Sequence, residues 1–136
     1  MSETTILKAS IGKTPYTTII DAGVHRLIGD EPLDKGGENR GPAPYDFILA
    51  ALATCTAATL RMYADRKGFA LEGVDLELEM EVEKTETGQV TRIERKITLK
   101  GELSESEEQR LMDIADKCPV HRLLTNEVQI NSILEK

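Results

Sequence analysis

The segment GPAPYDFILAALATCTAATLRMYA, residues 41–64, decides the fold of this 136-residue chain. Three threonines are the main interruption of its apolar run, between residues 47 and 60. Pro44 suits the first turn of a helix and Gly68 suits a left-handed helix end, so we predict a helix from Pro44 to about Lys67. The apolar run is too short to span a bilayer. We interpret it as a buried helix, enclosed either by a wrapping sheet or by a partner chain.

The residues before this helix predict a small antiparallel meander. Short β-type runs occupy residues 4–11, 16–21 and 25–28, and glycine and proline residues separate them. Residues 30–44 then collect three glycines and three prolines, a composition typical of an irregular loop.

The residues after the helix predict a long hairpin. Residues 74–83 alternate strictly between apolar and acidic side chains, which indicates a strand with one solvated acidic face. After a turn near Gly88, a second strand places Arg92, Lys96 and Lys100 where they can meet the acidic row.

A second helix and a last strand complete the predicted elements. Residues 104–107, SESE, form a capping box that begins the helix, which ends at Cys118 and Pro119. A short turn over residues 120–124 leads to a strand predicted from Val128 to Leu134.

Length and composition narrow the class of protein. The length fits a single domain over residues 1–136, and 40% hydrophobic with 30% charged residues is an ordinary globular balance. The 24 acidic residues outnumber the 17 basic ones, and the net charge of −7 argues against nucleic acid or an anionic membrane as partner. The first ten residues have no signal-peptide core, so we expect a cytoplasmic protein.

The two cysteines are too few for a disulfide scaffold, and a reducing compartment would keep them as thiols. Cys55, inside the apolar helix, has the setting of a small buried hydrophobe. Cys118 precedes Pro119, which can start a helical turn whose N–H groups lower a thiol pKa. Cys118 and His121 could be half of a zinc site. No second closely spaced ligand pair is present, so we predict no metal, and a metal on Cys55, Cys118 and His121 is a weak alternative.

Residues 41–64, followed by KCPVHR at residues 117–122, resemble the OsmC/Ohr family of osmotically inducible and organic hydroperoxide resistance proteins. The resemblance covers the whole chain. It implies an α+β fold with antiparallel sheets around two central helices, an intertwined homodimer, and a thiol peroxidase site at the interface without a cofactor. It also implies that Cys55 is the peroxidatic cysteine and Cys118 the resolving one.

The implied chemistry agrees with two cysteines. A thiolate attacks the O–O bond and becomes a sulfenic acid, which condenses with a second thiol to a disulfide. The two Cα atoms must then approach within about 7 Å. An external thiol or dithiol reduces the bridge, and the aliphatic surroundings favour an organic hydroperoxide as substrate.

The chain departs from the family pattern around the thiol. Well-characterised members pair it with an Arg and with a Glu directly after the proline that opens the helix. Here Tyr45 follows that proline, so the candidate acid is Asp46, and the candidate cations are Arg26 and Arg40. Asp46 is equally typical of a first-turn carboxylate that favours the helix dipole, and the arginines are typical of solvated side chains.

Two consequences remain open at the level of sequence. Asp46 and Cys55 lie about 13 Å apart along one helix, so an active Asp46 would have to reach across a dimer. The altered positions also support a different function, a non-catalytic dimeric protein that binds a small ligand in an apolar interface pocket.

Overall fold

The computed structural model describes residues 2–135, which form an α+β fold with antiparallel sheets. The chain divides into two compact units, the first ending at Ile48 and the second beginning at Leu49. The predicted α+β class is confirmed. The single domain over residues 1–136 stays a prediction.

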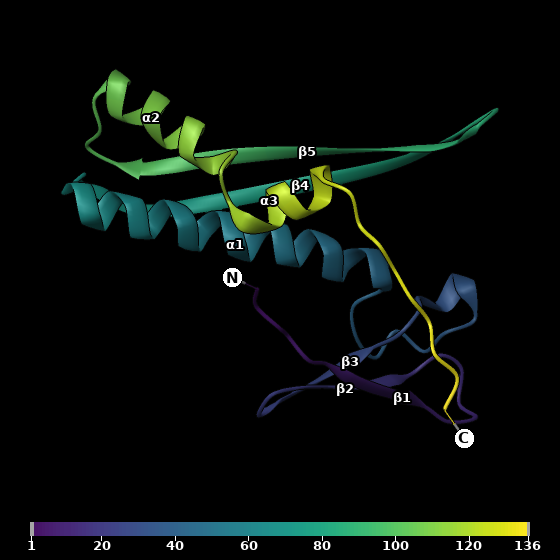
Figure 1. The fold of residues 1–136 in the computed structure, drawn as a ribbon. Coiled ribbons are helices and arrows are strands. Elements are labelled where there is room, and N and C mark those ends of the chain that lie inside the picture. The colour runs from purple at the N-terminus through teal and green to yellow at the C-terminus, as the bar shows by residue number, and fades with distance from the viewer. Residues whose placement is uncertain (1, 136) are drawn as a thin grey trace. The chain divides into compact units, whose positions relative to one another are not determined.

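The first unit contains the predicted meander (Figure 1). Strands β1, β2 and β3 pair antiparallel in chain order and span Lys8–Ile11, Thr18–Ala22 and His25–Gly29. The first strand begins four residues later than the β-type run at residue 4 predicted, so part of that run is irregular. The loop that follows contains one short 3-10 turn, η1, at Leu33–Lys35.

Asp30 organises this loop, because its buried carboxylate accepts hydrogen bonds from three strand and loop segments. Its oxygens lie 3.2 Å from the Tyr16 backbone N, 2.8 Å from the Glu31 N and 3.1 Å from the Arg40 N. Burial acts to raise the pKa of Asp30, but the backbone donors, led by Arg40, outweigh it and lower the pKa. The loop is therefore held by a charged acceptor.

Acid should lower the stability of the fold because it protonates the Asp30 carboxylate. The folded-state pKa lies below the ordinary value of 3.8, so the carboxylate stabilises the fold above that value and loses this contribution as pH falls. We expect Asp30→Asn to lower the melting temperature at neutral pH and to flatten its decline in acid. Melting curves against pH test this, with the exposed Asp34→Asn as control. A decline in Asp30→Asn as steep as in the native chain would contradict the assignment.

The second unit packs α1 on a long hairpin (Figure 1). Its elements are α1, which begins in the first unit, then β4, β5, α2 and α3, spanning Pro44–Lys67, Leu71–Thr85, Gly88–Gly101, Glu105–Ala115 and Pro119–Thr125. The predicted start and end of α1 are confirmed, and Gly68 has the left-handed φ of 73° that its end requires. The predicted capping box is also confirmed, since the Ser104 hydroxyl and Glu107 backbone, and the Glu107 carboxylate and Ser104 backbone, hydrogen-bond reciprocally.

The core of the second unit lies between α1, the hairpin and α2. Leu60, Leu71 and Leu111 are buried there, one from each of these elements. On the outer face, the predicted ion pairs between the acidic row and Arg92, Lys96 and Lys100 are present at 3.0–3.8 Å. These pairs are exposed, so they add at most about 1 kcal/mol each, and burial of the apolar face contributes more to the stability of the hairpin.

Two predictions for the C-terminal part are wrong. Residues 120–124 are not a turn but lie within helix α3, because Pro119 starts a helix that runs to Thr125. The predicted strand Val128–Leu134 does not form, since residues 127–135 have no strand or helix. A strand needs a neighbouring edge to satisfy its backbone groups, and none pairs with this segment within the described chain.

α1 is much less covered in the single chain than the sequence predicts. Only Leu52, Thr56, Leu60, Tyr63 and Ala64 are buried among its 24 residues. By length and composition, the helix could cross a membrane. Its most apolar 18-residue stretch has a mean hydropathy of 1.4, and 28% of that stretch is buried. Core helices of soluble proteins have the same length and apolar composition, so these two properties alone do not indicate a membrane-spanning helix. The wrapping sheet that we considered does not enclose the helix, and a partner chain remains the predicted cover.

Candidate active site

Cys55 lies in the middle of α1, within the second unit. Its side chain is half-buried, beside the buried line formed by Leu52, Thr56 and Leu60. The helix thus leaves this thiol open to a reagent on one side while its neighbour Thr56 points into the protein.

Cys118 is fully buried at the start of α3. Its backbone is extended and Pro119 begins the helix, as the sequence predicts. The Cys118 sulfur accepts a hydrogen bond from the backbone N of His121 at 3.4 Å. This N–H is free to bond the sulfur because the first turn of a helix has no internal acceptors for it.

The two thiols are free and close enough for each to change the pKa of the other. Burial raises the pKa of Cys55, and the neighbouring Cys118 raises it further. Burial also acts to raise the pKa of Cys118, but the His121 N–H, the Cys55 thiol and the Thr56 hydroxyl outweigh it and lower the pKa. Cys118 is therefore the more acidic thiol of the pair.

Thr56 and Arg95 extend this cluster. The Thr56 Oγ1 atom lies 3.9 Å from the Cys118 sulfur, and it accepts a hydrogen bond from the Arg95 guanidinium at 2.9 Å. The guanidinium also donates to Asp116 at 3.0 Å and lies 3.4 Å from the Nδ1 atom of the His121 ring. Residues of α1, β5 and the start of α3 thus meet around one sulfur.

The sequence-based prediction of site residues missed Arg95. The signal for it was present, because Arg95 occupies the inward position of β5 between Ile93 and Ile97. A charged residue in an apolar row needs a buried partner, and that requirement marks it as a candidate.

The sequence profile of the family described as "OsmC-like protein" matches residues 36–132, more than half of the chain. The chain belongs to the OsmC-like family. This confirms the resemblance drawn from residues 41–64 and 117–122. No curated protein sequence matches the chain.

Solved structures agree with the family. The chain is similar to an OsmC-like protein from Mycoplasma pneumoniae, with 19% identity, a TM-score of 0.79 and coverage of 92% of this chain and 89% of the other. It is also similar to the organic hydroperoxide resistance protein OsmC from Legionella pneumophila, with 26% identity, a TM-score of 0.68 and coverage of 90% and 89%. A third similar structure is an organic hydroperoxide resistance protein from Elizabethkingia anophelis, with 18% identity, a TM-score of 0.69 and coverage of 90% of this chain and 89% of the other.

The other three candidate residues of this OsmC-like chain lie in the first unit, and each has a partner of its own. Asp46 accepts a hydrogen bond from the Ala43 backbone N at 3.0 Å, which is half of a capping box at the start of α1. Arg26 pairs with Asp21 at 2.9 Å, and Arg40 with Glu38 at 2.6 Å. The structure joins Cys55 and Cys118 within one unit, whereas a role for Asp46, Arg26 or Arg40 stays a prediction.

Metal binding has no arranged ligand set in the described part of the OsmC-like chain. Among residues 2–135, no group of three or more His, Cys, Asp or Glu side chains is placed to hold a metal ion. This geometry does not support the alternative of a metal bound by Cys55, Cys118 and His121. The ring of His121 faces the Arg95 cation, which competes with a metal ion for the same Nδ1 lone pair.

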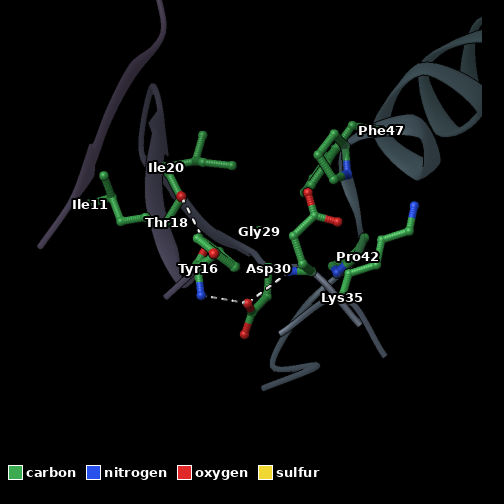
Figure 2. A pocket seen from close by; sticks show the side chains of 11 residues that line it. Ile11, Tyr16, Thr18, Ile20, Gly29, Asp30, Lys35, Pro42 and Phe47 are labelled. Atoms are coloured by element: carbon green, nitrogen blue, oxygen red, sulfur yellow. Dashed lines mark hydrogen bonds between the residues drawn. The ribbon is translucent and has the colours of Figure 1, made fainter. Parts of the chain in front are cut away.

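A pocket of about 590 Å³ lies in the first unit, between the meander and the segment that leads into α1 (Figure 2). Its apolar walls include Ile11, Ile20 and Phe47. The polar and charged groups of its lining are Tyr16, Thr18, Asp30, Glu31 and Lys35. Neither cysteine lines it. Its composition fits a small, largely apolar molecule.

Proposed function

We propose that this OsmC-like protein is a thiol-dependent peroxidase that reduces organic hydroperoxides, with Cys55 as nucleophile and Cys118 as resolving thiol. The observation that carries the proposal is a pair of free thiols, far apart in the sequence, that the packing of α1 against the start of α3 brings together. Thr56, next to Cys55 in α1, lies 3.9 Å from the Cys118 sulfur, and each thiol shifts the pKa of the other. Such a pair is what closure of a disulfide requires. Cys55 is the more accessible thiol, so a bulky peroxide meets it first.

The acid–base relation of the thiols supplies the proton transfer. The Cys118 thiolate accepts the Cys55 proton as the Cys55 sulfur attacks the outer peroxide oxygen. The O–O bond breaks, Cys55 becomes a sulfenic acid, and the alkoxide takes the proton back from Cys118 to leave as an alcohol. The Cys118 thiolate then attacks the Cys55 sulfur, and hydroxide leaves as the disulfide forms.

The remaining parts of the proposal follow from this cycle. A thiol or dithiol reductant regenerates both cysteines with loss of two electrons from the reductant. A cytoplasmic location suits the cycle, since that compartment keeps the resting thiols reduced. We also propose a homodimer, in which a second copy covers the exposed side of α1.

Intact mass spectrometry tests the function directly. One equivalent of cumene hydroperoxide should remove two hydrogens per native chain, and a following dithiol should restore the original mass. Hydrogen peroxide, applied in the same way, should react more slowly because it gains little from apolar surroundings. An unchanged mass in the folded native chain would overturn the peroxidase proposal.

The pocket of the first unit favours one second candidate, a small-ligand-binding protein without catalysis. Under that candidate, the Cys55→Ser/Cys118→Ser double variant would bind an apolar fluorophore as well as the native chain does. Phe47→Ala, which removes one pocket wall, would weaken binding. Mass loss with peroxide would separate the two functions, since ligand binding alone produces none.

A further inference from the structure

Arg95 is a charged residue in a position that the sheet otherwise gives to apolar side chains. The inward row of β5 is Ile93, Arg95, Ile97 and Leu99, and the Arg95 side chain is only 11% exposed. Removing a guanidinium from water is costly unless its donors are bonded. The placement therefore indicates a specific set of partners.

The partners of Arg95 come from three separate segments. One terminal nitrogen donates to the Thr56 hydroxyl of α1 at 2.9 Å. The other donates to Asp116, which precedes α3, at 3.0 Å and lies 3.4 Å from the His121 ring of α3. A planar guanidinium with several fixed donors can hold all three at once, which a lysine cannot.

Two of these three partners also contact the Cys118 sulfur. The Thr56 Oγ1 lies 3.9 Å from it, and the His121 backbone N lies 3.4 Å from it. Arg95 thus holds the Thr56 hydroxyl and the His121 ring, the side chains of two residues that contact the buried thiol.

The Thr56 hydroxyl can serve either form of that thiol. Its Oγ1 also lies 2.7 Å from the Leu52 carbonyl oxygen, and a hydroxyl has one hydrogen to donate. With Cys118 protonated, the hydroxyl donates to Leu52 and can accept the S–H. With Cys118 as thiolate, the hydrogen turns to the sulfur. Arg95 occupies the other lone pair and strengthens the hydroxyl as a donor.

We propose that Arg95 is a positioning residue of the thiol site: by holding Thr56 and His121 it stabilises the Cys118 thiolate that closes the disulfide. This inference rests on the proposed peroxidase function for its role in turnover, but not for its effect on the thiol. In that turnover the Cys118 thiolate attacks the sulfenic sulfur of Cys55, the S–S bond forms, and the S–O electron pair leaves with hydroxide.

Several charged or titratable groups belong to the surroundings of Cys118. They are Cys55 from α1, Arg95 from β5, His121 from α3, and the chain neighbours Asp116 and Lys117. Asp116 offsets little of the Arg95 charge, because its side chain is 69% exposed and solvent screens the pair. A net positive charge therefore remains on the buried side of the site.

The test measures the Cys118 titration by thiolate absorbance in a Cys55→Ser background, where Cys118 is the chain's single thiol. Arg95→Met should raise the apparent pKa of Cys118 by about one unit, and Arg95→Lys should raise it less. Arg92→Met is the matched control, because Arg92 is an exposed residue of the same strand that pairs with Glu83. It should leave the titration unchanged.

Thr56 gives a second, independent variant. Thr56→Val preserves shape but removes the hydroxyl, and it should raise the apparent pKa in the same direction. Thr56→Ser restores the hydroxyl and should return the titration toward the native value. Thermal unfolding of each variant separates a local effect from a loss of fold. Folded Arg95→Met and Thr56→Val chains with native Cys118 titration would overturn the inference.

Peroxide reactions distinguish this inference from the proposed function. In the two-cysteine chain, Arg95→Met should prolong the Cys55 sulfenic acid about threefold at a pH below the Cys118 pKa. The thiolate fraction falls about tenfold per unit, while the more basic thiolate is about three times more nucleophilic. If the Cys118 titration shifts in Arg95→Met but the native chain consumes no peroxide, the peroxidase function is refuted and the positioning role of Arg95 is supported. If the native chain consumes peroxide but the Cys118 titration does not shift in Arg95→Met, only the positioning role of Arg95 is refuted.

Discussion

Cys55→Ser should abolish the consumption of organic hydroperoxide, whereas Cys118→Ser should retain one turnover, at a lower rate because the Cys118 thiolate no longer accepts the Cys55 proton. The reason is the difference between the two sites. Cys55 is half-buried and reachable, while Cys118 is fully buried and lies beside Thr56 and His121. Without Cys118, the sulfenic acid of Cys55 has no partner thiol, so it persists and oxidises further to sulfinic acid.

Stopped-flow consumption of cumene hydroperoxide, combined with a sulfenic acid trap and intact mass, measures both variants. Cys55→Ser should lose at least about three orders of magnitude in rate, a typical cost of removing a catalytic nucleophile. Cys118→Ser should consume about one equivalent in the first phase and a second equivalent more slowly, as the sulfenic acid becomes sulfinic acid. If Cys118→Ser instead loses the first turnover and Cys55→Ser keeps it, the two roles are reversed.

The second large effect concerns assembly: the chain should form a homodimer that Ala58→Glu disrupts. Exposed residues recur at helical spacing along α1 at Ala51, Thr54, Ala58 and Met62, and Met62 is 68% exposed. Three of these side chains are small, so a second helix can approach closely. A glutamate at the centre of this face would place an unpaired charge in the interface.

Sedimentation at micromolar concentration should show a dimer for the native chain and loss of the dimer for Ala58→Glu. Ala70→Glu, an equivalent change at an exposed residue outside the helix, is the control. A stable, folded native monomer would contradict the homodimer and remove the interface from the proposed site. Retention of the dimer in Ala58→Glu would place the interface on another surface.

The sequence alone predicts the elements well where local chemistry decides them. Pro44 and Gly68 delimit α1, the alternation in residues 74–83 defines β4, and Ser104 with Glu107 begins α2. Each of these signals acts between residues close along the chain, through helix ends, strand faces and reciprocal caps. The predicted strand over Val128–Leu134 fails for the opposite reason, because a strand depends on an edge that the segment itself cannot supply.

The two cysteines could be identified from their motifs, but their relation could not. Their local settings indicate a buried thiol on a helix and a thiol before a helical turn, and the family resemblance links them. That they meet, and that Cys118 is the more acidic, depends on packing α1 against the start of α3. The family resemblance directed attention to a cation before Cys55, at Arg26 or Arg40, although the charge of Arg95 within the apolar row of β5 was itself a signal.

By itself, then, the sequence determined the α+β elements up to the end of α2, the family and the two thiols, because periodicity, caps and motifs are local properties of the chain. Only the tertiary structure decided that Arg95, Thr56 and His121 gather around Cys118. These residues come from separate helices and strands, and nothing in their spacing relates them. Burial makes the grouping consequential, since a guanidinium and a thiol removed from water interact far more strongly than on an exposed surface.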